Sequence, residues 1–218
     1  MKKELNIKQK RVMIYFISAT KKLIEQEGLE NLTVRKIASS AGYNSATLYN
    51  YFQDMEELVV FASIGYLKDY ISELEHALTP ELNARQRYRT IYEVFSKACF
   101  SRPELFYGLF YGKYKTRLKS VISVYYDLFP DELGHHKGEV LQMLTQGEIM
   151  ERDNSVMPSL IAEHFVLPKN AVQTVSLMTR MFQSYLYDSW ILKDERPVDE
   201  QIAPVLETFE YIMDKAML

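Results

Sequence analysis

Apolar residues recur three and four positions apart along most of the chain, which is the spacing that places side chains on one face of an α-helix. One such stripe begins at Leu58 and predicts a single long helix from Asp54 to Leu78. No segment shows the strict alternation that is typical of a strand. The pattern therefore predicts an all-α fold, with further helices over residues 83–100, 115–129, 133–150, 159–166, 170–192 and 199–217.

The expected breaks between these helices fall at glycine and proline, namely at Gly112, Pro130, Gly134, Pro168 and Pro197. The sequence Ser101-Arg-Pro-Glu104 predicts a capping box at the start of a helix, with proline in its first turn.

Residues 33–52 predict two short helices joined by a tight turn. Thr33 and Asn44 are expected to cap them, because each side-chain oxygen can accept a hydrogen bond from a free backbone N–H. Gly42 lies where the chain must turn sharply, and glycine adopts positive φ without steric cost. Two short helices in this arrangement indicate a helix-turn-helix, a module that reads the major groove of DNA.

The second of these helices has two different faces. Leu48 and Phe52 are four residues apart and are expected to lie in the core. On the other side, Ala46 permits close approach to base edges, and Asn50 offers both a donor and an acceptor. The flanking residues are Ser45, Thr47, Tyr49 and Tyr51. An alternative is that the two tyrosines pack against the neighbouring domain.

The same segment combines Gly28, the run Thr33-Val-Arg-Lys-Ile-Ala38, the pair Ala41-Gly42 and the run from Thr47 to Leu58. This block, about residues 8–60, resembles the amino-terminal domain of TetR-family transcriptional regulators. Ala46 departs from the family's usual glycine, and Met55 stands where the family usually has a phosphate-binding lysine. The resemblance implies DNA contacts by Thr33, Arg35, Tyr43, Asn44, Ser45, Thr47, Tyr49, Asn50 and Tyr51.

Charge is distributed unevenly along the chain. Residues 1–52 contain nine Lys and Arg against four Asp and Glu, near +5, whereas residues 53–218 are near −8. This asymmetry is expected if only the amino-terminal end meets a polyanion. Together with the resemblance it implies a DNA-binding domain (1–52) and a helical effector-binding and dimerisation domain (53–218). An arm along the phosphates is one interpretation of Lys2, Lys3, Lys8, Lys10 and Arg11, and a solubilising tail is the other.

Composition indicates a soluble cytoplasmic protein. A chain of 218 residues that is 47% hydrophobic can bury a substantial core. The single cysteine, Cys99, excludes an intramolecular disulfide framework and fits a reducing compartment. The longest apolar stretch, Leu58 to Leu67, is about half of the ~20 residues that cross a bilayer, so no membrane partner is expected.

The last two long helices carry broad apolar faces, and two such helices from each of two chains would form a four-helix interface. The resemblance also implies a homodimer. The candidate interface residues are Met178, Phe182, Tyr185, Trp190, Val205, Phe209 and Ile212. The alternative is that the core of the same chain fills these faces.

For the middle helices, the resemblance implies a cavity for a small-molecule effector. The candidate lining residues are Phe95, Cys99, Phe106, Phe110, Tyr114, Tyr125 and Met143, each of which is also typical of ordinary core. The acidic balance favours a neutral or cationic effector. The predicted function is a dimeric repressor that an effector releases from a palindromic operator on double-stranded DNA.

Two other classes of function were weighed against a regulator. An enzyme is disfavoured, because His135 and His136 stand beside Gly134 in an expected turn and the sequence contains no zinc-ligand spacing, nucleophile elbow or phosphate-binding loop. We therefore expect no catalytic residue, metal or cofactor. A helical ligand-binding or scaffolding protein with a vestigial DNA-binding domain stays open, and Met55 is the feature that motivates it.

Overall fold

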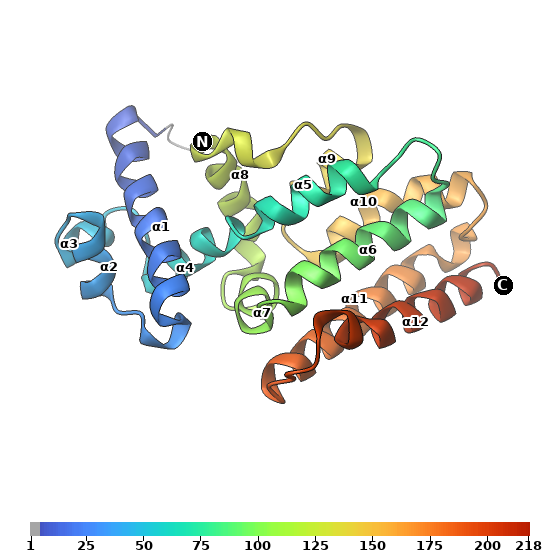
Figure 1. The fold of residues 1–218 in the computed structure, drawn as a ribbon. Helices are drawn as coiled ribbons and strands as arrows, with labels where there is room; N and C mark the ends of the chain where they lie inside the picture. The colour runs from blue at the N-terminus through green and yellow to red at the C-terminus, as the bar shows by residue number, and fades with distance from the viewer. Residues whose placement is uncertain (1–4) are drawn as a thin grey trace.

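The computed structural model describes residues 5–218, which form twelve α-helices, four short 3-10 helices and no strand (Figure 1). The predicted all-α fold is therefore confirmed. The amino-terminal elements are α1 (Ile7–Glu27), η1 (Leu29–Asn31), α2 (Val34–Ala41) and α3 (Ser45–Leu48). They are followed by α4 (Met55–Ile64), α5 (Leu67–Ala77), α6 (Ala84–Phe100), α7 (Pro103–Tyr111), η2 (Lys115–Arg117), α8 (Leu118–Leu128), η3 (Pro130–Leu133), α9 (Gly138–Leu144), α10 (Ile149–Ala162), η4 (Pro168–Asn170), α11 (Ala171–Ile191) and α12 (Val198–Ala216).

The first three helices pack around fully buried side chains, with Phe16 of α1, Ile37 of α2 and Leu48 of α3 at 0% exposure.

Helix α1 begins at Ile7, so the proposed arm residues Lys8, Lys10 and Arg11 lie on a helix rather than on a flexible segment. Lys10 forms an ion pair with Asp127 of α8, with 2.9 Å between Nζ and Oδ1. Lys2 and Lys3 lie outside the described residues. The interpretation of Lys8, Lys10 and Arg11 as part of an arm is therefore wrong.

The single helix predicted from Asp54 to Leu78 is wrong, because the chain forms α4 and α5 with a break at Gly65 and Tyr66. At the break the backbone lies against α1: Lys21 Nζ donates to Gly65 O at 3.3 Å, and Tyr66 Oη donates to Lys21 O at 3.2 Å. A Cβ on residue 65 would come within 2.6 Å of Lys21 Nζ and Tyr125 Oη. Contacts that are distant in sequence decide this break, and the apolar stripe does not report them.

The helices predicted at 133–150 and 159–166 are also wrong in their limits. Residues 130–133 form a 3-10 turn, Gly134 and Gly138 adopt positive φ, and α9 ends at Leu144. Helix α10 then continues through Pro158 to Ala162. A proline inside a helix removes one backbone hydrogen bond, and burial of the apolar side of α10 offsets that loss.

The junction between α6 and α7 contains no capping box. Arg102 is the N-cap of α7 and makes no side-chain capping bond, while Ser101 Oγ donates back to Ala98 O at 2.7 Å. Pro103 is the first residue of α7, so the predicted proline in the first turn is confirmed. The helices predicted at 83–100, 170–192 and 199–217 match α6, α11 and α12 to within one residue at each end.

The larger carboxy-terminal part is a bundle in which α11 and α12 lie side by side and both contact α6 (Figure 1). Its centre is aromatic. The ring of Tyr92 lies 5.1 Å from that of Tyr88, 5.1 Å from that of Phe209 and 6.2 Å from that of Phe182 between centroids. Helix α4 contacts α1 on one side and α7 and α8 on the other, so it connects the two parts. No helix of residues 5–218 has the length and apolar character needed to cross a membrane.

Candidate nucleic-acid interface and effector site

The turn between α2 and α3 has the geometry of a helix-turn-helix. Thr33 Oγ1 accepts a hydrogen bond from Lys36 N at 3.2 Å, and Asn44 Oδ1 accepts one from Thr47 N at 2.9 Å, so both predicted caps are confirmed. Gly42 has a φ of 78°, in the left-handed region that favours glycine. The N–H of Tyr43 bonds to Ala38 O at 2.9 Å and closes the turn.

Helix α3 is short, but its turn continues past Leu48 through hydrogen bonds from the N–H groups of Tyr51 and Phe52 to Leu48 O. This keeps Leu48 and Phe52 together in the core, at 0% and 2% exposure. On the opposite side Ala46, Tyr49 and Asn50 are exposed. The result is a surface of small, polar and aromatic side chains without an acidic group, which suits approach to base edges and phosphates.

The aromatic residues around the turn divide into two groups. Tyr49 is 56% exposed, whereas Tyr51 is half-buried in a groove lined by Met13, Phe61 and Val121. Tyr43 stacks on Phe16 with ring centroids 5.4 Å apart. Packing against the neighbouring domain, the alternative for Tyr49 and Tyr51, therefore describes the environment of Tyr51 and not that of Tyr49.

The start of α4 is fixed to the region between α7 and α8. Asp54 caps α4 by accepting from Glu57 N at 2.8 Å, and its other oxygen accepts from Lys113 Nζ at 2.7 Å and Tyr114 Oη at 2.8 Å. Burial raises the pKa of Asp54, but these hydrogen bonds outweigh it, and the pKa lies below its usual value. Arg117 adds an ion pair to the buried Glu57 at 3.2 Å. These contacts join the helix-turn-helix end to the larger bundle.

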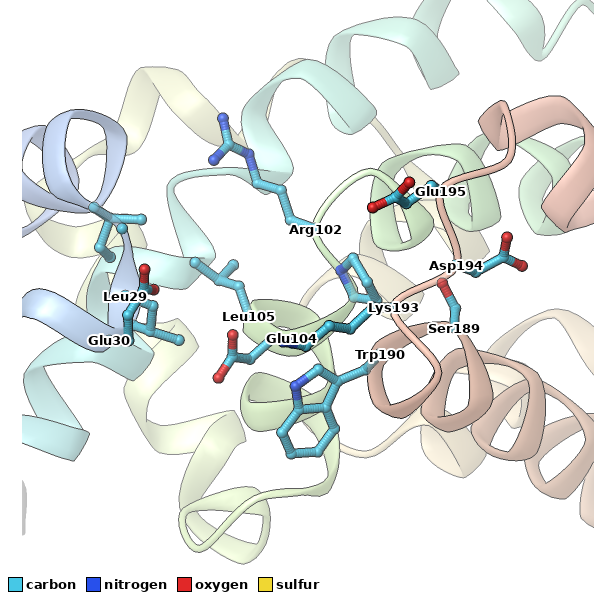
Figure 2. Close-up of a pocket in the computed structure, with 13 residues that line it drawn as sticks. Leu29, Glu30, Arg102, Glu104, Leu105, Ser189, Trp190, Lys193, Asp194 and Glu195 are labelled. Carbon is cyan, nitrogen blue, oxygen red and sulfur yellow. The ribbon is translucent and has the colours of Figure 1, made fainter.

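A cleft of about 470 Å³ separates η1 from α7 and the end of α11. Figure 2 shows Glu104 and Leu105 of α7, with Trp190 of α11, facing Leu29 and Glu30 of η1. Leu29, Leu105 and Trp190 also line an adjoining hollow of about 290 Å³, which Met55 and other apolar residues of α4 complete. Any rotation between the two parts of the molecule would change the width of this cleft.

Inside the bundle lies a closed cavity of about 20 Å³ with charged residues in its wall. Arg152 and Asp153 of α10 are only 4% and 6% exposed. Arg152 Nη2 and the hydroxyl of Tyr70 have no hydrogen-bond partner in the described part of the chain. The guanidinium lies 5.3 Å from the ring centroid of Phe95 and 5.7 Å from that of Phe110.

Asp153 lines the same cavity but forms no ion pair with this guanidinium in the described part of the chain. Tyr92 Oη donates to Asp153 Oδ2 at 2.9 Å, and Thr179 Oγ1 lies 3.4 Å from the same oxygen. Burial raises the pKa of Asp153 to about 7, although Tyr92, Tyr88 and Arg152 oppose the shift. Burial likewise raises the pKa of Tyr70 to about 12, against the effect of the nearby Arg152. The carboxyl therefore keeps its proton to a higher pH than an exposed aspartate does, and it is a weak counter-charge for Arg152.

The seven effector candidates from the sequence are all buried, but they do not form one wall. Phe95 and Met143 line the closed cavity, and Phe110 lies beside Arg152. Cys99 and Phe106 are core residues of α6 and α7, and burial raises the pKa of the Cys99 thiol well above its usual value. Tyr114 bonds to Asp54 at the domain junction, and Tyr125 donates to Glu132 at 2.6 Å, so both lie elsewhere.

The dimer candidates are mostly covered by their own chain, as the alternative interpretation held. Met178, Phe182, Val205 and Phe209 are 0% exposed and Ile212 is 8% exposed, whereas Tyr185 and Trp190 are half-buried. The apolar side chains that α11 and α12 do expose are different ones, namely Val172, Leu177, Tyr187, Ile191 and Tyr211.

Sequence reasoning missed Arg152 and Asp153, although the pattern contained a signal for them. Both occupy positions on the apolar stripe of α10 that also includes Ile149, Val156 and Leu160. A charged pair at positions that the helical period assigns to the core indicates a buried polar site. The predicted helices 133–150 and 159–166 leave residues 151–158 outside any helix, so the sequence prediction did not place Arg152 and Asp153 on this stripe.

The exposed α3, its capped turn and the attached helical bundle together define a helix-turn-helix protein. Residues 16–60 match the model of the family described as bacterial regulatory proteins, tetR family. The predicted resemblance is thereby confirmed: the chain has a TetR-family amino-terminal domain on the fold of the TetR-family transcriptional regulators.

Solved structures with low sequence identity share this fold over nearly the whole chain. FadR of Thermus thermophilus, a TetR-family transcriptional repressor in complex with lauroyl-CoA, is 15% identical with a TM-score of 0.60, covering 94% of this chain and 95% of its own. FadR of Bacillus halodurans, a fatty acid degradation regulator, is 13% identical with a TM-score of 0.55, covering 95% and 96%. RolR in complex with resorcinol is 14% identical with a TM-score of 0.51, covering 96% and 94%. No curated protein matches the chain in sequence.

Proposed function

We propose that the protein is a dimeric, sequence-specific DNA-binding regulator that occupies a palindromic operator and is released from it by a small-molecule effector. The observation that carries the proposal is the exposed surface of α3 behind a capped, glycine-containing turn. The net charge of residues 1–52, near +5 in a chain of net charge −3, supports a polyanionic partner at this end. A DNA partner also favours a cytoplasmic location.

The proposed DNA contacts surround α3 and the start of α2. Arg35, Tyr49 and Asn50 are exposed and can reach phosphates or base edges, and Asn50 offers a donor and an acceptor on one side chain. Tyr51 is the weakest member of the set, because its ring is half-buried in the groove beside α8. The remaining proposed contacts are Thr33, Tyr43, Asn44, Ser45 and Thr47.

A dimer is proposed because one short helix gives little affinity, whereas two recognition helices about 34 to 36 Å apart, or a multiple of that, read successive turns of DNA. The exposed face of α11 supplies Leu177, Tyr187 and Ile191, and Tyr211 of α12 is 64% exposed. Isolated exposed apolar residues are ordinary, but a row of them on one helix favours an interface. The proposed partner is a second copy of this chain.

Effector release is proposed to act through α4 and α5. Helix α5 carries Tyr70 in the wall of the closed cavity, and α4 contacts α1 beside the helix-turn-helix. An effector that prefers a conformer with misplaced recognition helices would weaken DNA binding, by a coupling free energy typically of ~1 to 3 kcal/mol. The break at Gly65 and the Asp54 contacts transmit the change between the two parts.

The first test is selection of bound duplexes from a random DNA pool, followed by affinity measurements at two salt concentrations. We expect an enriched palindrome and a steep fall of affinity with salt. Asn50→Ala with Tyr49→Ala should reduce operator affinity at least tenfold without changing folding or dimerisation, since each base contact contributes ~1 to 3 kcal/mol. Asn154→Ala, an exposed position on α10, is the matched control and should change nothing.

Absence of an enriched sequence would instead favour a helical ligand-binding or scaffolding protein with a vestigial DNA-binding domain. Met55 motivates that alternative, and its side chain lies in the apolar hollow beside Leu29 rather than on the surface of α3. The proposal includes no catalytic role. His135 and His136 are adjacent in the sequence and lie against α5, where His136 Nε2 bonds to the backbone O of Ile71 at 3.0 Å. Among residues 5–218 no group of His, Cys, Asp or Glu has a metal-binding arrangement.

A further inference from the structure

The buried guanidinium of Arg152 lacks the partners that a charge in a protein interior requires. A guanidinium has five N–H donors. Within the described chain Arg152 makes one long hydrogen bond, from Nη1 to Leu144 O at 3.5 Å, while Nη2 has no acceptor. The adjacent carboxyl of Asp153 bonds to Tyr92 instead.

Burying a charge without a partner is unfavourable, because the lost hydration is not replaced. The rings of Phe95 and Phe110 supply cation–π contacts but accept no hydrogen bonds in the plane of the guanidinium. Tyr70 contributes a second unsatisfied polar group, its hydroxyl, to the same cavity wall. Arg152 and Tyr70 line one cavity, and each has a buried polar atom without a hydrogen-bond partner in the described chain, which favours an acceptor that is supplied from outside the chain.

We propose that the effector of this protein is a small organic acid whose carboxylate binds Arg152 Nη2 and the Tyr70 hydroxyl. A planar carboxylate matches the fork of a guanidinium and accepts two hydrogen bonds from it. Ile91, Phe95 and Phe182 make much of the remaining wall apolar and suit the hydrocarbon part of the acid. Asp153 also lines the cavity, but its carboxyl bonds to Tyr92 and burial raises its pKa, which lessens its repulsion of a bound carboxylate. The overall acidic charge of the chain favours a neutral or cationic effector. The Arg152 guanidinium lies in the cavity wall itself, so it affects a bound ligand more strongly than distant surface charges do.

The cavity is too small for an organic acid without movement. Its volume of about 20 Å³ exceeds the ~10 to 15 Å³ that one water occupies, but it does not hold a hydrocarbon group. Entry of an acid must therefore displace side chains between α10, which carries Arg152, and α5, which carries Tyr70. Since α5 continues into α4 through Gly65, the displacement is directed toward the helix-turn-helix.

The assignment of this acid as the effector rests on the proposed function, but its binding is measured independently of DNA. The probes are benzoate, phenylacetate and hexanoate, each compared with its neutral primary amide by calorimetry and thermal unfolding of the full chain. We expect at least one acid to bind and to raise Tm, with the matching amide at least tenfold weaker. Arg152→Met should remove this difference, and Tyr70→Phe should reduce it several-fold.

The Tm of Arg152→Met without ligand shows whether this variant still folds. Because Arg152 is unpaired, Arg152→Met should have a Tm equal to or above that of the wild type, and the exposed Arg180→Met is the matched control on α11. The inference is overturned if none of the acids binds at 10 mM, if acid and amide bind equally, or if Arg152→Met lowers Tm strongly. A single water between Arg152 and Tyr70 would give the first of these results. Intact operator binding with any of them would leave the proposed regulator standing.

Discussion

Arg152 and Asp153 are adjacent in the sequence and line the same cavity, yet their side chains have different partners. Arg152 faces the rings of Phe95 and Phe110, and Asp153 faces hydroxyl groups of Tyr92 and Thr179. Residue types alone predicted the caps at Thr33 and Asn44, since those bonds are local. The environments of Arg152 and Asp153 depend on helices far away in the sequence, so they required the structure.

Asp153→Asn should change how stability depends on pH. The carboxyl has a pKa of about 7 when folded and ~3.9 in an unfolded chain, so the folded state holds the proton between these values. Wild-type stability should therefore fall by up to ~1.4 kcal/mol per pH unit from pH 4 to 7 relative to the variant, and then level off. Urea unfolding of both proteins at pH 4.5, 6 and 8 measures the difference, and parallel curves would contradict it.

At the scale of elements, the turn between α2 and α3 and the break between α4 and α5 illustrate what a local pattern can and cannot predict. Gly42 was predicted at the turn, since positive φ follows from the chain's own geometry. Gly65 was read as part of a continuous helix, and its break depends on Lys21 and Tyr125, which come from α1 and α8. The apolar period persists across the break because both helices face the same core.

Gly42→Ala should destabilise the protein by ~1 kcal/mol, because a φ of 78° is strained for a residue with a Cβ. No atom lies within 4 Å of the added Cβ, so backbone strain is the whole expected cost. Gly42→Asn should lose less, since asparagine tolerates the left-handed region. Chemical denaturation midpoints measure both variants, with Ser40→Ala, at an exposed position in the last turn of α2, as the control. Equal midpoints for the alanine variant and the wild type would contradict the assigned turn.

For the whole molecule, the sequence correctly indicated a helix-turn-helix domain attached to a helical bundle. The predicted interface residues, however, lie mostly on the sides of α11 and α12 that face the core of the same chain. Phe182 and Phe209 are fully buried against α6, whereas Leu177 and Tyr187 are exposed. A helical period identifies every apolar position, and it does not separate the side that meets the chain's own core from the side that meets a partner.

Leu177→Glu combined with Tyr187→Glu should convert the proposed dimer to a monomer, because four buried carboxylates would face one another across a two-fold axis. Operator affinity should fall with it, since both half-sites must be occupied. Sedimentation equilibrium measures the mass, and Met150→Glu, at an exposed apolar position on α10, is the control. A variant that stays dimeric would move the interface away from this face of α11.

Trp190 is the only tryptophan of the chain, and it lies where the two parts of the molecule meet. Its ring is 5.2 Å from that of Tyr107 and 6.0 Å from that of Tyr187, and its exposed edge lines the cleft opposite Leu29. Indole emission responds to the polarity around the ring. The unlabelled protein thus contains one optical reporter in the cleft between η1 and α11, and a change in the width of this cleft during titration with DNA or with an acid would change its emission.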